Sequence, residues 1–158
     1  MPLAGTILVV DDSPDDVALL LRTFRQLGIV NRIHVCDGGR AALDYLFQDL
    51  NSPPSIILLD LKMPGVDGFQ VLRKIKNHPI LRDIVVIVLT TSSDRMDIQL
   101  GYELGANSFL TKPLDLDEFR EMVSAFHKYW LIRSQPPEQR GRWIKPPNGG
   151  GSEDPKEK

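Results

Sequence analysis

Five polar side chains that could bind a cation and a phosphoryl group each end or follow a run of apolar residues. They are Asp11, Asp12, Asp60, Thr90 and Lys112. Carboxylates held close together repel one another, and a hard divalent cation relieves that repulsion. Ligation by oxygen atoms alone, with no His or Cys nearby, favours Mg²⁺ over Zn²⁺. An ammonium and a hydroxyl group beside the cation would complete a site for phosphoryl oxygens.

The apolar runs alternate along the chain with amphipathic segments. Continuous apolar or β-branched runs indicate strands buried on both faces, and apolar residues three or four apart indicate helices. Ser13 followed by Pro14 is typical of a helix start, and so is Asp115 with Glu118. The sequence predicts strands over residues 6–10, 33–36, 55–60, 84–90 and 108–110, and helices over 14–27, around 42–47, and over 69–76, 96–104 and 116–132.

Five strand–helix pairs in succession predict an α/β fold with a doubly wound parallel sheet covered by helices on both faces. Right-handed crossovers place the C-terminal ends of the strands at one edge of the sheet, where ligands bind in such folds. The five polar side chains should therefore meet in one crevice. Asp60 ends a strand expected near the centre of the sheet, and we interpret it as a nucleophile that forms an acyl phosphate.

Composition excludes several classes of protein. The chain has 158 residues, of which 42% are hydrophobic and 25% charged, and its formal net charge is −2. This balance disfavours binding to nucleic acid or to acidic membranes through bulk charge. The longest apolar runs are too short to span a bilayer, and the first residues do not form a signal peptide. The single cysteine, Cys36, fits a reducing compartment, so we expect a cytoplasmic protein.

Charge and apolar residues divide the chain into two unlike parts. Residues 1–132 carry 13 basic and 17 acidic side chains, whereas residues 133–158 carry 6 basic and 4 acidic ones. The second part has only Trp143 and Ile144 as large apolar groups, too few to offset the entropy of ordering it. We predict one domain over residues 1–132, followed by a mostly disordered, Pro- and Gly-rich tail over residues 133–158.

Five motifs, taken in order, resemble the receiver domain of two-component response regulators. The resemblance covers residues 6–132, and it implies a flavodoxin-like sheet with strand order 2-1-3-4-5 and five helices. The end of the last predicted helix and the prolines after it are similar to stand-alone receivers of the cyanobacterial phytochrome type. The motifs are Asp11-Asp12, the strand-end Asp60, Lys62-Met63-Pro64-Gly65 with Asp67-Gly68, Thr90-Thr91-Ser92 and Lys112-Pro113, and the subgroup segment is Tyr129-Trp130-Leu131 with Pro136-Pro137.

The resemblance implies a phosphoacceptor and a set of Mg²⁺ ligands. Asp60 would accept a phosphoryl group from a phosphohistidine of a histidine kinase or a histidine phosphotransfer protein. Asp12 and Asp60 would bind Mg²⁺ directly, and Asp11 would bind it through water. The backbone carbonyl of Lys62 would complete the protein ligands.

Three further residues would act on the phosphoryl group or respond to it. Thr90 would hydrogen-bond the group and move on activation, and Lys112 would pair with one of its oxygens. Phe109 occupies the position of the family's switch aromatic, although a core aromatic is the simpler interpretation. The Lys112-Pro113 bond is commonly cis in the family. The Lys62 ammonium is either solvated or lies over the phosphoryl group and changes its hydrolysis.

The resemblance implies a single-domain response regulator rather than an enzyme that turns over a substrate. Phosphorylation would switch the face formed by residues 96–104, 108–110 and 116–132. The same face, with the C-terminal segment, is a candidate homodimer contact. The 26 residues after position 132 are too few for a folded effector domain. Output would therefore pass to a downstream protein target, with no role for nucleic acid or membrane.

Two alternative functions stay open. A phosphohydrolase with an aspartate nucleophile is built on a similar sheet, but its chemistry typically uses a second Asp two residues after the nucleophile. This chain has Lys62 at that position. A pseudo-receiver that acts only as a scaffold is the second alternative, and the complete set of five polar residues disfavours it.

Overall fold

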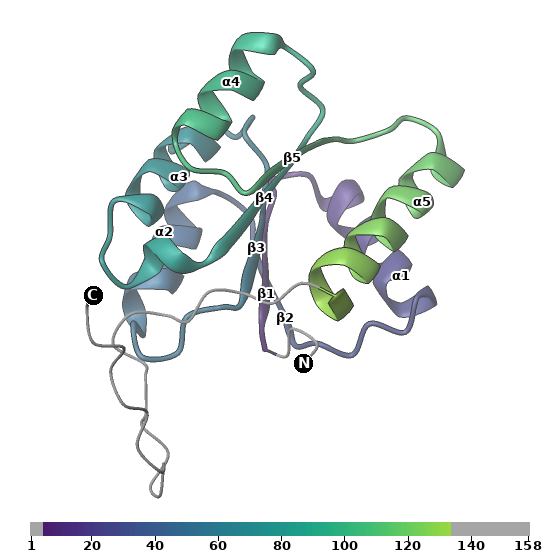
Figure 1. Cartoon of the computed structure of the whole chain (residues 1–158), viewed down its shortest axis with the longest axis horizontal. Coiled ribbons are helices and arrows are strands. Elements are labelled where there is room, and N and C mark those ends of the chain that lie inside the picture. Colours follow the sequence, from purple (N-terminus) through teal and green to yellow (C-terminus); the bar gives the residue numbers. More distant parts are fainter. Residues whose placement is uncertain (1–4, 134–158) are drawn as a thin grey trace, which may run out of the picture.

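The computed structural model describes residues 5–133, which form a parallel sheet between two layers of helices (Figure 1). The sheet has the order β2-β1-β3-β4-β5, and every neighbouring pair of strands is parallel. Helices α2, α3 and α4 cover one face, and α1 and α5 cover the other (Figure 1). The strands are β1 (Ile7–Val10), β2 (Ile33–Cys36), β3 (Ile56–Leu59), β4 (Val85–Thr90) and β5 (Ser108–Thr111), and the helices are α1 (Pro14–Gln26), α2 (Gly39–Gln48), α3 (Gly68–Lys76), α4 (Arg95–Glu103) and α5 (Leu116–Phe126).

The three inner strands explain why the sheet is covered on both faces. Every residue of β1, β3 and β4 is buried, so neither face of these strands can be left to solvent. Alternate side chains point to opposite faces and form two separate hydrophobic clusters. Leu8 and Val10 of β1 pack under α2 and α3, whereas Ile7 and Val9 pack under α1 and α5. The predicted α/β class and strand order are confirmed.

Side-chain caps fix where the helices begin. Ser13 Oγ accepts a hydrogen bond from the Asp16 amide at 3.3 Å, as its place before Pro14 predicts. Asp67 and Gln70 form a reciprocal capping box, with both hydrogen bonds 2.9 Å long. Gly68 follows because a Cβ there would lie 2.2 Å from the Asp60 carbonyl oxygen. The Asp67-Gly68 motif therefore seats the start of α3 directly against the loop after β3.

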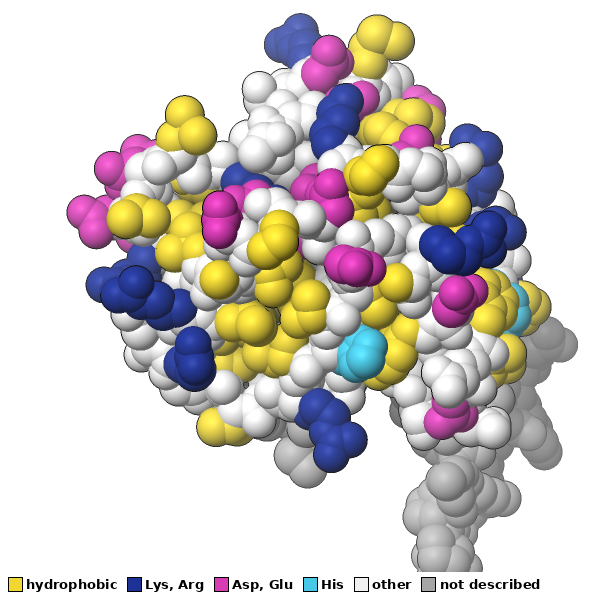
Figure 2. Space-filling view, turned by 180° about the vertical axis from the view of Figure 1, so that it is seen from behind, with side chains coloured by type: hydrophobic (Ala, Val, Ile, Leu, Met, Phe, Trp, Pro, Cys, Tyr) yellow, Lys and Arg dark blue, Asp and Glu magenta, His cyan; other side chains and the backbone are white. Residues whose placement is uncertain are grey.

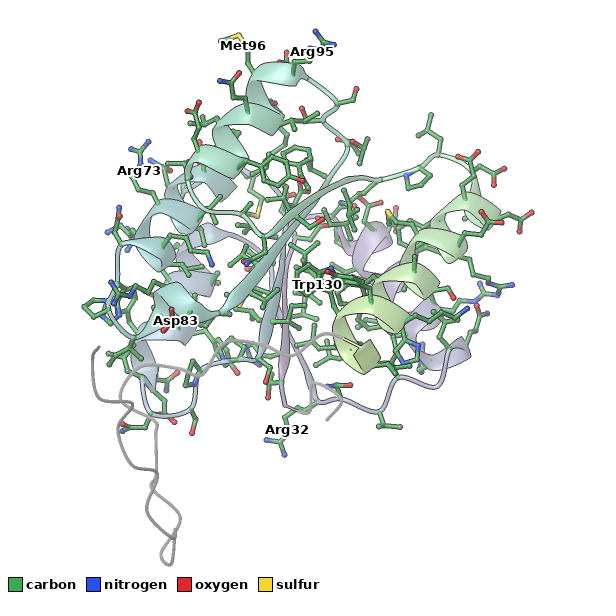
Figure 3. The ribbon with its side chains drawn as sticks, in the orientation of Figure 1. Arg32, Arg73, Asp83, Arg95, Met96 and Trp130 are labelled. Atoms are coloured by element: carbon green, nitrogen blue, oxygen red, sulfur yellow. The ribbon has the colours of Figure 1, made fainter. Side chains whose placement is uncertain are left out.

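Predicted and observed elements differ most at the end of the last helix. The predicted strands agree with the observed strands within one residue, but the single helix predicted over 116–132 is α5 followed by a π-helical segment, His127–Arg133. The wider turn still buries Leu131, and Trp130 points from this segment towards the sheet (Figure 3). Phe47 of α2 is 43% exposed, and its ring contacts the His78 ring edge-to-face.

Two further expectations concern the backbone and the tail. No peptide bond in the part of the chain that the structure describes is cis, so the cis Lys112-Pro113 bond common in the resembled family is not found. The predicted tail over 133–158 lies, apart from Arg133, outside the described residues.

Within residues 5–133, none of the helices has the length and apolarity needed to cross a membrane. On the face opposite to that of Figure 1, basic and acidic side chains are interspersed with hydrophobic ones (Figure 2).

Candidate phosphoryl and metal site

The five polar residues singled out in the sequence meet at the C-terminal edge of the sheet. Asp11 and Asp12 follow β1, Asp60 follows β3, Thr90 ends β4 and Lys112 follows β5. Backbone hydrogen bonds continue the ladder past the strand ends and fix these positions. The Asp60 amide donates to the Val10 carbonyl at 2.9 Å, and the Lys112 amide donates to the Thr90 carbonyl at 2.7 Å. The sheet itself therefore determines where each side chain begins.

Three carboxylates converge closely enough to share one cation. Ligand oxygens of Asp11, Asp12 and Asp60 all lie within 4.8 Å of one another. Asp11 and Asp60 are buried, whereas Asp12 is exposed and leaves the cluster open to solvent. All three donors are hard carboxylate oxygens, which is the chemistry that Mg²⁺ requires. The predicted metal-ligating carboxylates are thus brought together, and their donor set fits Mg²⁺.

The ammonium of Lys112 lies among these acids. Its Nζ lies 2.6 Å from Asp11 Oδ2, 2.9 Å from Asp16 Oδ2 and 3.4 Å from Asp60 Oδ2. Burial lowers the pKa of Lys112, but hydrogen bonds to Asp11 and Asp16 and the charges of Asp60 and Asp11 outweigh that effect. The pKa of Lys112 is therefore held above its ordinary value, and the ammonium stays charged.

Asp16 is a member of the site that sequence reasoning missed. Its carboxylate is 42% exposed, and it sits in the first turn of α1. The acidic pair Asp15 and Asp16 is explained equally well by the preference of helix N-termini for negative charge. Only the turn of α1 after Asp12 shows which of the two carboxylates reaches Lys112.

The buried carboxylates are oriented by nearby backbone amides. Asp11 Oδ1 accepts a hydrogen bond from the Ser13 amide at 2.9 Å, and Asp60 Oδ1 accepts one from the Lys62 amide at 3.3 Å. Burial nevertheless raises the pKa of Asp11, because the hydrogen bonds from Lys112 and Ser13 only partly offset the loss of water. A divalent cation beside Asp11 would offset part of this cost of burying the carboxylate, as a metal site here requires.

Thr90 ends β4, and Phe109 lies on the neighbouring strand β5. Thr90 is fully buried, and its hydroxyl oxygen accepts a hydrogen bond from the Ser92 amide at 3.4 Å. Phe109 is half-buried; its ring packs over Gly101 of α4, and its centroid is 6.5 Å from that of Tyr102. Its amide donates to the Tyr102 hydroxyl at 3.1 Å. Phe109 therefore joins β5 to α4, and this contact is compatible both with a core aromatic and with a switch aromatic.

Lys62 has a partner that the sequence did not predict. Its Nζ lies 3.2 Å from Asp97 Oδ2, although 62% of the Lys62 side chain is exposed. Asp97 also accepts a hydrogen bond from the Ser92 hydroxyl at 2.6 Å. That hydrogen bond, followed in effect by the contact with Lys62, lowers the pKa of Asp97. The Lys62 ammonium is thus partly solvated, as the simpler interpretation expects, but it is also half of an ion pair.

Comparison with known proteins places the chain in a family. The model of the response regulator receiver domain matches residues 7–124. The chain is 41% identical over 128 residues to the probable methanogenesis regulatory protein FilR2 of Methanothrix harundinacea, covering 79% of this chain and 83% of that protein. It is 40% identical over 129 residues to the response regulator Rcp1 of Synechocystis sp., covering 79% of this chain and 88% of that protein.

Solved structures agree with the sequence relatives. The Mn²⁺-bound form of Rcp1 superposes with a TM-score of 0.78 at 38% identity, covering 85% of this chain and 99% of that chain. The phosphorylated cyanobacterial phytochrome response regulator RcpA superposes with a TM-score of 0.80 at 32% identity, again covering 85% and 99%. Fold, motifs and relatives agree that the chain belongs to the response regulator receiver domain family of two-component signalling.

Proposed function

We propose that Asp60 accepts a phosphoryl group from a phosphohistidine on a histidine kinase or a histidine phosphotransfer protein. Phosphorylation of an Asp with Mg²⁺ is typical of the family. The observation that carries the assignment to Asp60 is that its carboxylate lies close both to the other two acids and to the Lys112 ammonium. It lies within 4.8 Å of Asp11 and Asp12 and 3.4 Å from the ammonium of Lys112.

In this transfer a carboxylate oxygen of Asp60 forms a bond to phosphorus while the bond from phosphorus to the donor imidazole nitrogen breaks. The electron pair of that bond stays on the imidazole. Bound Mg²⁺ would neutralise charge on the phosphoryl oxygens. Lys112 would pair with one of those oxygens, and Thr90 would donate a hydrogen bond to another.

The same carboxylates would hold the cation. Asp12 and Asp60 would bind Mg²⁺ directly, Asp11 would bind it through water, and the backbone carbonyl of Lys62 would complete the protein ligands. Support comes from the convergence of the three carboxylates and from the amide of Lys62, which lies 3.3 Å from Asp60 Oδ1. Further support comes from two solved relatives, Rcp1 in its Mn²⁺-bound form and RcpA in its phosphorylated form.

Output would pass through the face formed by α4, β5 and α5. Thr90 would move towards the phosphoryl group, and Phe109, which joins β5 to α4, would follow. Met96 of α4 is 80% exposed and points into solvent (Figure 3), and Leu116 of α5 is 67% exposed. These apolar side chains are available to a downstream protein or to a second copy of the chain. The protein would act as a cytoplasmic regulator, not as an enzyme with an external substrate.

Acetyl phosphate provides a direct test of the phosphoacceptor. With Mg²⁺ the full chain should gain the mass of one phosphoryl group, Asp60→Asn should not, and the control Asp44→Asn, an exposed residue of α2, should behave as wild type. No adduct on wild type, or an adduct kept by Asp60→Asn, would contradict the proposal. Rapid multiple turnover of an external phosphate ester would favour the phosphohydrolase instead.

Association through the α4-β5-α5 face has its own test. Sedimentation of the full chain with and without beryllofluoride and Mg²⁺ should show a dimer that Met96→Ser weakens. A monomer under both conditions would remove the dimer from the proposal and leave the phosphoacceptor untouched.

A further inference from the structure

The ion pair between Lys62 and Asp97 connects the phosphorylation loop to α4. Lys62 follows Asp60 by two positions, and Asp97 lies in the first turn of α4. Their charged atoms are 3.2 Å apart. The loop after β3 leads into α3, whereas α4 follows β4. The ion pair therefore joins two different strand–helix units.

Asp97 is held on its other side by the loop that positions Thr90. The Ser92 hydroxyl donates to Asp97 Oδ2 at 2.6 Å, and the Ser92 amide donates to Thr90 Oγ1 at 3.4 Å. The Thr111 hydroxyl at the end of β5 donates to the Ser92 carbonyl at 3.2 Å. One continuous set of contacts therefore runs from Lys62 through Asp97 and Ser92 to Thr90 and to β5.

The Lys62 end of this set is weak and close to the phosphoacceptor. Exposed ion pairs contribute little because water and salt screen them, and the Lys62 side chain is 62% exposed. Its own backbone amide already contacts Asp60 Oδ1 at 3.3 Å. A phosphoryl group on Asp60 would add a concentrated negative charge beside that backbone, and it would compete with the single carboxylate of Asp97 for the ammonium.

We propose that Lys62 is a transferable cation, paired with Asp97 before phosphorylation and with the phosphoryl group on Asp60 afterwards, so that phosphorylation releases the start of α4. Lys62 would act as a positioning residue for α4 in one state and as a counter-ion of the phosphoryl group in the other. The proposal rests on Asp60 being the phosphoacceptor, and it adds a route from that residue to α4 beside the one through Thr90.

Competition for Lys62 would link the charge of Asp97 to the affinity of the site for a phosphoryl group. If Asp97 and the phosphoryl group compete for Lys62, removing the charge of Asp97 frees the ammonium and tightens phosphoryl binding. For an exposed pair the expected gain is about two- to fivefold in affinity. The gain must require Lys62, whereas a general effect of removing one negative charge would not.

The experiment is a double-mutant cycle on the full chain with beryllofluoride and Mg²⁺ as the probe. Affinities for wild type, Lys62→Gln, Asp97→Asn and the double variant are measured by ¹⁹F NMR titration. The control is Lys74→Gln, which removes an exposed lysine from α3. Thermal unfolding confirms that each variant is folded. We expect Lys62→Gln to fold because the Lys62 side chain is largely exposed.

Asp97→Asn should bind the probe about two- to fivefold more tightly than wild type, and this gain should vanish in the Lys62→Gln background. An equal gain in both backgrounds, or no gain in either, would overturn the transfer of Lys62. Probe binding that is absent in wild type or unaffected by Asp60→Asn would instead overturn the phosphoacceptor, so the two failures are distinguishable.

Hydrogen exchange supplies a second readout that simple charge removal would not move. The amides of Met96 and Ile98, which donate to Asp94, should exchange faster in Lys62→Gln without the probe, and beryllofluoride should produce the same change in wild type. Protection that is equal in all four proteins and unaffected by the probe would contradict the release of α4.

Discussion

The Nζ atom of Lys112 lies 2.6 Å from Asp11 Oδ2, although 101 positions separate the two residues in sequence. Both side chains are less than a tenth exposed, so the pair is screened little by water. A buried pair of this kind is strongly destabilising to break, because the remaining charge is left without a partner. The contact is therefore both part of the site and part of the fold.

Replacing Lys112 with Met should destabilise the protein and increase its response to Mg²⁺. Breaking a buried ion pair costs about 3–5 kcal/mol in free energy of unfolding. Added Mg²⁺ should restore more stability to Lys112→Met than to wild type, because the cation replaces the missing ammonium. Urea unfolding with and without Mg²⁺ measures both effects, with Lys74→Met as the exposed control. Equal increments from Mg²⁺ in all three proteins would contradict the prediction.

Magnesium should stabilise the wild-type protein through Asp12, the exposed member of the carboxylate cluster. A ligand at ten times its dissociation constant adds about 1.4 kcal/mol to the free energy of unfolding. Asp12→Asn should lose most of this gain, whereas Asp15→Asn, an exposed residue of the same helix start, should keep it. Thermal unfolding across a Mg²⁺ titration provides the measurement. Stabilisation that survives in Asp12→Asn would place the cation elsewhere.

Gly101→Ala tests how freely the Phe109 ring moves. A Cβ at position 101 would lie 3.1 Å from Cδ2 and 3.3 Å from Cε2 of Phe109, so the ring must shift by a few tenths of an ångström. The ring is half-buried and can turn outward. We therefore expect the variant to gain up to about 1 kcal/mol from helix propensity while the ring resonances of Phe109 shift. A loss of stability with unchanged resonances would show that Phe109 is fixed in place.

Lys76 should make the free energy of unfolding depend on pH in the alkaline range. Its Nζ donates to the Ile84 carbonyl at 2.7 Å and to the Arg82 carbonyl at 3.1 Å, and burial lowers its pKa to about 8 from an ordinary 10.5. The unfolded chain then binds more protons than the folded chain between those values. The contribution of Lys76 to the free energy of unfolding therefore rises with pH across that window.

Comparison with Lys76→Met isolates this contribution, because other groups that titrate near pH 9–11 are common to both proteins. One such group is the buried thiol of Cys36, whose pKa burial raises to about 11 and which acts in the opposite direction. The difference in unfolding free energy, wild type minus variant, should increase from pH 8 to pH 10. A constant or falling difference would contradict the lowered pKa.

The sequence predicted the fold and the core of the site because both depend on strong, local patterns. Continuous apolar strands ending in Asp11 or Asp60 require a covered sheet, and a parallel sheet brings strand ends to one edge. The π-helical turn after Phe126 was not predictable, because the apolar spacing of residues 116–132 fits an ordinary helix. Phe47 fits the buried stripe of α2 in the same way, yet its ring packs on His78 at the surface.

The partners of the two site lysines could not be predicted, for a different reason. Asp16 and Asp97 each sit in the first turn of a helix, where an acidic residue is common without any partner. Which of several acids meets Lys112 or Lys62 depends on the direction in which each helix leaves the sheet. That direction is set by packing across the whole core, and no spacing in the sequence records it.

The ammonium that balances the acid cluster arrives on the last strand of the sheet. During synthesis the chain presents Asp11, Asp16 and Asp60 long before Lys112, and the backbone bond that seats Lys112 joins it to Thr90. A nascent or partly unfolded molecule therefore has these acids but lacks the ammonium that pairs with them in the folded chain. The charge balance of the proposed phosphoacceptor site therefore exists only in molecules whose sheet is complete to its last strand.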